Sequence, residues 1–186
     1  NTALASGKLV IASNASDQAP RAAFEEIVAK FQAANPDIDV QMNTTEHEAF
    51  KTAIRTILAA DKGPDVATWF AGNRMAGFVE DGLFADISDV WSQEGLASSM
   101  ASTMPSVTFG GKQYALPYSY YQWGVYYRKD IYDANGISVP KTYDEFLDNC
   151  KKLKANGIAS VAIGTKYLWT AAGWFDYINL RTNGLD

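Results

Sequence analysis

Residues 8–44 read KLVIASNASDQAPRAAFEEIVAKFQAANPDIDVQMNT, and this segment sets the order strand, helix, strand with which the fold begins. It opens with a short apolar run typical of a strand. A helix follows from about Pro20, because proline is favoured in a first helical turn. The dipeptide Asn35-Pro36 stops this helix, and residues 37–44 alternate between polar and apolar as a half-buried strand does. Between these limits, apolar side chains at helical spacing share one face, namely Phe24, Ile27, Val28 and Phe31.

The alternation of strands and helices continues as far as Gly82. Thr45 to Glu48 match a capping box that opens a second helix, residues 65–70 form a third strand, and a short helix ends near Asp81. This order predicts an α/β fold with a mostly parallel sheet and helices on both of its faces. Ligands bind such sheets beyond the carboxyl ends of the strands. The loops at those ends are 14–18, 44–48 and 69–73.

After Gly82 the pattern changes and then resumes as a second, shorter α/β block. The predicted elements are a hairpin turning at Gly110-Gly111, a helix over 142–155, a strand over 160–164 and a helix ending at Asn183. We expect a linker at 1–7, a first lobe at 8–115 that lacks a later return segment, and the truncated start of a second lobe at 116–186. A block this short buries a limited core, so we expect an unpaired sheet edge or exposed core there.

Charge and composition exclude several classes of function. The net charge is −5, and no cluster of Lys and Arg is present to bind nucleic acid phosphates. No apolar run approaches the roughly 20 residues that a membrane-spanning helix needs. Cys150, the one cysteine, cannot form a disulfide within the chain and is expected to be a buried, inert thiol. Phosphate-binding loops, dinucleotide fingerprints and Gly-x-Ser-x-Gly elbows are missing, and we expect no enzyme activity and no cofactor.

Several segments, taken in order, resemble family 1 extracellular solute-binding proteins. The most extended is Gly111–Tyr118, GKQYALPY, which is similar to that family's G-K-x-Y-(G/A)-x-P crossover between lobes. No single segment is specific, but their order along nearly the whole chain is. The other segments are Asn35-Pro36, Gly63–Val66, Gly82–Ile87, Tyr126–Asp130, Gly136-Ile137, Pro140–Phe146 and Leu153–Ile158.

The resemblance implies a two-lobed, periplasmic-binding-protein-like fold, here lobe one plus the beginning of lobe two. It implies a protein that binds a mono- or oligosaccharide in the cleft between the lobes and delivers it to the membrane permease subunits of an ABC transporter. The lobes would close about a hinge, the first crossover of which lies near Ala115–Tyr118. The expected location is periplasmic or extracellular, with or without a lipid anchor, and the expected state is a monomer.

Sugars present apolar C–H faces and many hydroxyl groups, so their sites combine aromatic rings with fixed polar groups. In the first lobe the predicted ligand-binding residues are Asn14, Asp17, Glu46, His47, Trp69, Phe70 and Asn73. After the crossover they are Tyr121, Gln122, Trp123, Lys166, Tyr167 and Trp169. The aromatic residues equally suit a core, and Asp17 equally suits a helix cap.

Three other interpretations remain open at this point. A metal at Glu46, His47 and Glu48 is disfavoured, because adjacent helical residues point in different directions and there is no second histidine. A receptor of the same fold for a nonsugar solute such as a polyamine would need several carboxylates among the aromatic residues. A glycoside hydrolase would need two carboxyl groups facing each other across an aromatic groove.

Overall fold

A computed structural model describes residues 7–93 and 95–184. The chain divides into two compact units, Asn1–Tyr121 and Gln122–Asp186, and each is considered by itself. The linker predicted at 1–7 lies outside the described residues except for Gly7, which begins the first strand. The lobe limits predicted from the sequence remain predictions.

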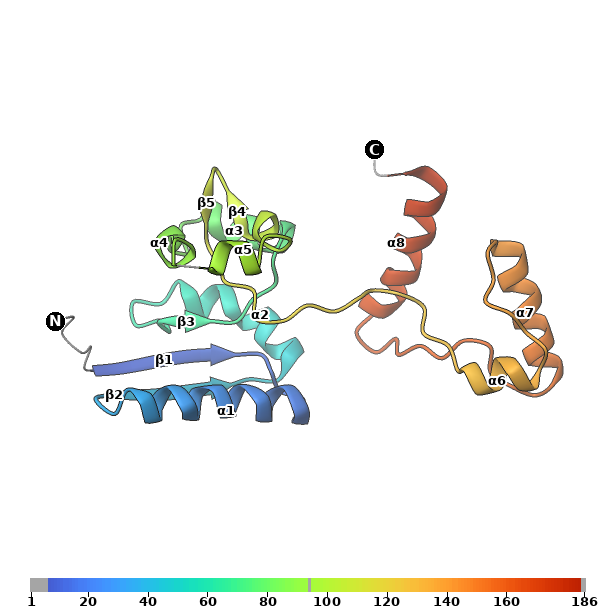
Figure 1. Ribbon diagram of the computed structural model, residues 1–186, viewed down its shortest axis with the longest axis horizontal. Helices are drawn as coiled ribbons and strands as arrows, with labels where there is room; N and C mark the ends of the chain where they lie inside the picture. The colour runs from blue at the N-terminus through green and yellow to red at the C-terminus, as the bar shows by residue number, and fades with distance from the viewer. Residues whose placement is uncertain (1–6, 94, 185–186) are drawn as a thin grey trace. The chain divides into compact units, whose positions relative to one another are not determined.

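The first unit is built on a parallel sheet of three strands, as predicted. β1 (Gly7–Ser13) lies in the middle, with β2 (Ile38–Thr44) on one side and β3 (Val66–Ala67) on the other (Figure 1). β1 and β2 pair along their full length, whereas β3 pairs with β1 at only two positions. The predicted strand over 65–70 is therefore too long, because pairing with β1 ends at the hydrogen bond from the Thr68 N–H to the Ala12 carbonyl.

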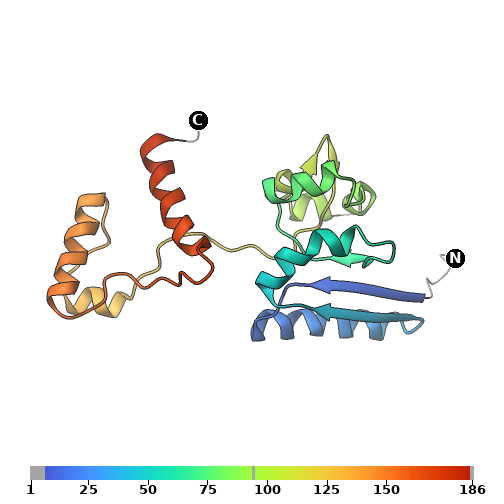
Figure 2. The same ribbon diagram turned by 180° about the vertical axis from the view of Figure 1, so that it is seen from behind.

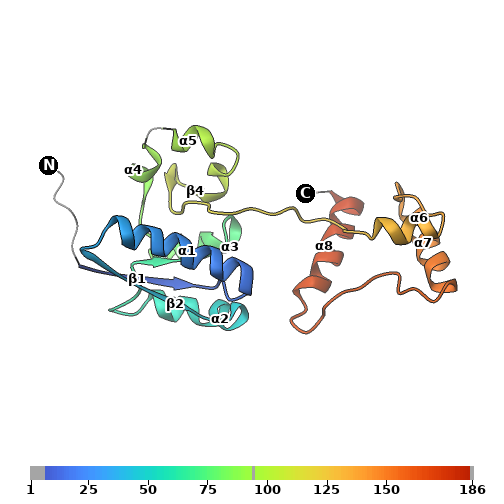
Figure 3. The same ribbon diagram turned by 60° about the horizontal axis from the view of Figure 1, so that its bottom comes forward.

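Two long helices connect these strands on opposite faces of the sheet. α1 (Gln18–Ala34) joins β1 to β2, and α2 (His47–Leu58) carries the chain back across β1 to β3. Right-handed connections in opposite directions place their helices on opposite faces. Accordingly, α1 lies in front of the sheet in Figure 1, and α2 lies in front of it in Figure 2, which is the view from behind. Figure 3 shows α1 lying across the strands.

The core of the first unit lies on the α2 face of the sheet. Phe50 and Ile54 of α2 are almost fully buried, at 0% and 1% exposed, and pack with Ala12 and Phe78. Phe78 belongs to α3 (Asn73–Glu80). The same helix contributes Met75 to a second cluster, in which Met75 packs with Trp91 and Val107. In contrast, no residue of α1 is buried, and its predicted apolar face leaves Ile27 57% exposed.

Short elements complete the first unit. The predicted hairpin is confirmed and turns at Gly110-Gly111, where both residues have positive φ angles that favour glycine. The elements are α4 (Ser88–Trp91), α5 (Leu96–Ser99), the 3₁₀ helix Met104–Val107, β4 (Thr108–Phe109) and β5 (Lys112–Gln113).

The second unit contains both predicted helices and a further short helix that was not predicted, but not the predicted strand. Its helices are α6 (Lys129–Ala134), α7 (Tyr143–Ala155) and α8 (Trp169–Asn183). Thr142 caps α7 as its capping box predicts, accepting a hydrogen bond from the Glu145 N–H at 3.1 Å. Within the described part of this unit, residues 160–164 form no strand, because they have no neighbouring strand to pair with.

The predicted exposure of the second unit's core is confirmed. A cavity of about 460 Å³ opens between α6, α7, α8 and the extended segments beside them, and apolar side chains dominate its lining. Leu153 is buried, but Phe175 of α8 is 70% exposed, and α8 has no buried residue. Cys150 is half-buried rather than buried, because its helix is covered on one side only.

Candidate functional site

The loops after β1 and β3 are tied together by Thr68. Its hydroxyl accepts a hydrogen bond from the Asn14 N–H at 2.9 Å and donates one to the Asn14 side-chain oxygen, also at 2.9 Å. Thr68 is 6% exposed, whereas Asn14 is half-buried, so the pair presents Asn14 at the carboxyl edge of the sheet. Asn14 was predicted from the sequence, whereas Thr68 was not, because the role of Thr68 depends on a contact across 54 residues.

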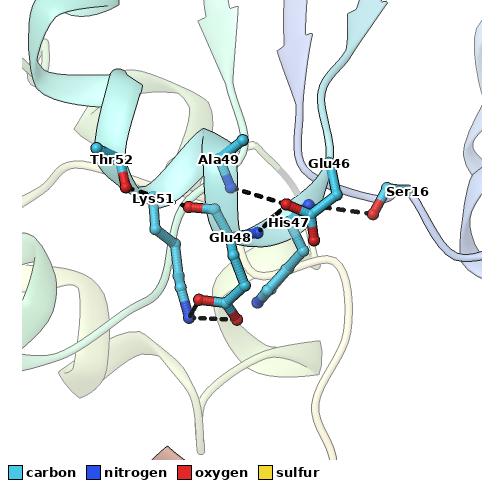
Figure 4. A network of polar contacts seen from close by, with 7 residues as sticks. All are labelled: Ser16, Glu46, His47, Glu48, Ala49, Lys51 and Thr52. Carbon is cyan, nitrogen blue, oxygen red and sulfur yellow. Dashed lines mark hydrogen bonds and ion pairs between the residues drawn. The ribbon is translucent and has the colours of Figure 1, made fainter. Parts of the chain in front are cut away.

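The loop after β2 is tied to the loop after β1 in the same way. The Ser16 hydroxyl accepts a hydrogen bond from the His47 N–H at 3.2 Å (Figure 4). The carboxylate of Glu46 accepts from the N–H groups of Glu48 and Ala49 at 3.0 and 2.9 Å, where the positive end of the helix dipole favours a negative charge. Glu46 therefore caps α2, and the capping box predicted from Thr45 begins one residue too early.

An aromatic cluster stands beside these loops. The ring of Phe70 meets Trp69 at 5.3 Å and His47 at 5.7 Å between centroids, both edge to face. The guanidinium carbon of Arg74 lies 4.6 Å from the Phe70 ring centroid. Trp69 also contacts Phe78 of the core at 5.0 Å, so Trp69 anchors the cluster and Phe70 extends it toward the polar loops.

The remaining predicted residues of the first unit lie at helix starts or at the end of the unit. Asp17 is the N-cap residue of α1, but its exposed side chain makes no capping hydrogen bond. Asn73 is the exposed first residue of α3, after Gly72, whose φ of 71° requires glycine. Tyr121 closes the first unit and is 76% exposed.

In the second unit the structure brings Trp123 and Trp169 together. Their ring centroids are 5.9 Å apart, with the planes inclined at 47°. Gly173 of α8 leaves the space for this arrangement, because a methyl group added there would collide with the Trp123 indole. Gly173 was not predicted from the sequence, since its importance depends on the packing of Trp123 against α8.

The other predicted residues of the second unit flank this pair of indoles. Lys166 places its ammonium group 4.9 Å from the Tyr167 ring centroid. Leu168, which follows, has a φ of 62°, a left-handed conformation that costs a residue with a β-carbon about 1–2 kcal/mol. The carbonyl of Gln122 accepts a hydrogen bond from the Tyr126 hydroxyl at 3.0 Å.

The described residues contain no group of three or more His, Cys, Asp or Glu side chains arranged to hold a metal ion. Over the same ranges, the helices are too short or too polar to cross a bilayer. The predicted residues place partly exposed rings beside fixed hydrogen-bonding groups, a combination that is typical of small-molecule sites.

Comparisons with known proteins agree on one family. The family described as bacterial extracellular solute-binding proteins matches residues 14–184. An ABC transporter extracellular-binding protein of Pyrococcus horikoshii is 27% identical over 170 residues, 88% of this chain and 38% of that protein. The melibiose/raffinose/stachyose-binding protein MelE of Bacillus subtilis is 27% identical over 155 residues, 82% of this chain and 34% of that protein.

A solved structure extends the agreement to the fold. The bacterial solute receptor AcbH, described as having an exclusive substrate preference for β-D-galactopyranose, is 31% identical and superposes with a TM-score of 0.84. The superposition covers 98% of this chain and 46% of that one, so this chain spans less than half the length of the relatives it matches. These relatives are binding proteins. Because the family match runs over residues 14–184 and the fold of AcbH is reproduced over nearly the whole chain, this chain belongs to the bacterial extracellular solute-binding proteins.

Proposed function

We propose that this chain is part of a receptor that binds a sugar and delivers it to the permease subunits of an ABC transporter. The observation that carries the proposal is the Phe70 ring, which stands beside His47 at the carboxyl edge of a parallel sheet, two residues after the Thr68 hydroxyl that holds Asn14. Carbohydrate-binding relatives support it, among them AcbH, at 31% identity over 98% of the chain.

The ligand is recognised by residues from both units. Phe70 with its polar neighbours supplies one part of the site, and Trp123 with Trp169 supplies the other. A ligand that bridges two lobes favours their closed arrangement by its differential affinity for that state. The closed receptor then docks on the permease as a monomer outside the cytoplasmic membrane, and no bond of the sugar is broken.

The distribution of carboxylates favours a sugar over a polyamine. Glu46 is engaged as the cap of α2, and Glu48 pairs with Lys51 at 2.7 Å. Among the site residues predicted from the sequence, Asp17 is the one carboxylate left without a capping role. A polyamine needs several free carboxylates, and a glycoside hydrolase needs two that face each other.

The test is a thermal-shift screen of the complete protein against mono- and oligosaccharides, with polyamines, amino acids and metal salts as controls. A ligand at about 100 times its Kd stabilises the native state by about 2.7 kcal/mol, which raises the Tm. A shift with a sugar, and no product after overnight incubation, would support the proposal. A shift with a polyamine alone, or cleavage of an oligosaccharide, would overturn it.

A further inference from the structure

We propose that Arg74 is a positioning residue for ligand binding, acting through the ring of Phe70. The inference rests on the proposed function, because it assumes that Phe70 contacts the sugar. Arg74 was not among the residues predicted from the sequence, and no sequence motif marks it.

The Phe70 ring is held by three neighbours of different chemistry. Trp69 and His47 meet it edge to face, and the Arg74 guanidinium lies over its face with the carbon atom 4.6 Å from the centroid. An aromatic ring binds a sugar more tightly when its orientation is fixed before the ligand arrives, because binding then does not have to order the side chain. Of the three, only Arg74 contacts the ring from α3.

The position of Arg74 argues against a purely structural role. The residue is exposed, and within residues 7–93 and 95–184 its guanidinium forms no ion pair. It lies in the first turn of α3, where the helix dipole disfavours a cation. Within the described residues, the interaction of the Arg74 side chain is therefore its contact with the Phe70 ring.

The backbone of Arg74 has a separate function that a substitution leaves intact. Its carbonyl accepts a hydrogen bond from the Trp69 indole N–H at 3.1 Å. Arg74→Met therefore removes the contact of the guanidinium with the Phe70 ring but keeps the hydrogen bond from the Trp69 indole to the backbone. The variant thus tests the contact with Phe70 by itself.

Arg55 provides a matched control elsewhere in the same unit. Its guanidinium carbon lies 4.7 Å from the Phe78 ring centroid, and it also pairs with Asp81. This second cation–ring contact packs on the core cluster, since Phe78 is 8% exposed. Arg55→Met is expected to lower the Tm without changing sugar affinity.

The experiment measures the Kd of the complete protein for its best sugar by titration calorimetry, for Arg74→Met, Arg74→Lys, Phe70→Leu and the double variant Arg74→Met/Phe70→Leu. A cation–ring contact at an exposed site contributes about 0.5–1 kcal/mol, so Arg74→Met is expected to weaken binding about two- to fivefold. Arg74→Lys should restore most of the affinity, and Arg74→Met should have no further effect beside Phe70→Leu.

Each other outcome has a distinct meaning. An unchanged Kd in Arg74→Met, or the same weakening in Arg55→Met, overturns the inference and leaves the sugar-binding proposal standing. Equal weakening with and without Phe70→Leu overturns it too, since Arg74 would then contact the sugar directly. If the unmodified protein binds no sugar of the screen, the proposed function itself has failed, which the calorimetry shows before any variant is made.

Discussion

At the scale of single residues, hydrogen bonds hold together the loops of the proposed site, which are far apart in the sequence. Thr68→Val removes the hydroxyl that bridges to Asn14 while keeping the shape of the side chain. The N–H and the side-chain oxygen of half-buried Asn14 then lose their hydrogen-bond partner. We therefore expect the free energy of unfolding to fall by about 1–3 kcal/mol. Urea denaturation measures it. Thr52→Val is the control, because its hydroxyl bonds only within its own helix, and equal losses in the two variants would contradict the prediction.

Asp86 makes stability depend on pH. A hydrogen bond from the Ser88 hydroxyl, with further ones from the Ser88 N–H and Lys112, lowers its pKa from the usual 3.8 to about 2. A carboxyl group with a lowered pKa in the folded state stabilises the fold above its unfolded pKa, and this stability is lost as pH falls from about 4 to about 2.

Asp86→Asn should therefore lose less stability between pH 5 and pH 2 than the unmodified chain. Urea denaturation at the two pH values measures the difference. Asp61→Asn is the control, because Asp61 has no hydrogen bond or ion pair among the described residues. An identical pH dependence in Asp86→Asn and the unmodified chain would show that Ser88 and Lys112 do not act on this carboxylate.

At the scale of secondary structure, α8 determines where the indole of Trp123 lies. Gly173→Ala places a methyl group against that indole, and the ring must move because the helix backbone cannot. We expect weaker sugar binding and a changed tryptophan fluorescence spectrum, since Trp123 would leave Trp169. Gly164→Ala is the control, because a methyl group there meets nothing within 4 Å. Unchanged affinity in Gly173→Ala would remove Trp123 from the proposed site.

At the scale of the whole molecule, the proposal requires both units to hold the ligand. The predicted site residues fall on both sides of the division between Tyr121 and Gln122. Phe70→Ala in the first unit and Trp123→Ala in the second are each expected to weaken binding. Saturating sugar should lower the radius of gyration of the complete protein in X-ray scattering, and a sugar that binds without changing it would contradict lobe closure.

How much of the fold was predictable depends on how local each interaction is. The periodicity of 8–82 was sufficient to predict a parallel sheet with helices on both faces, because strands and helices repeat with different periods and their alternation can be read from the sequence. The prediction of a strand over 160–164 was wrong, because a strand depends on an interaction that is not local. A strand exists only through a partner, and the described part of the second unit supplies none.

Periodicity, turn residues and the order of the segments were enough to predict the class of fold, the family and the loops in which we propose the site to lie. Which side chains act together became clear from the folded chain alone. Thr68 beside Asn14, Arg74 over Phe70 and Gly173 under Trp123 are all contacts that no spacing rule encodes. Their physical basis is packing between elements, which depends on where folding brings the chain and not on which residues are neighbours along it.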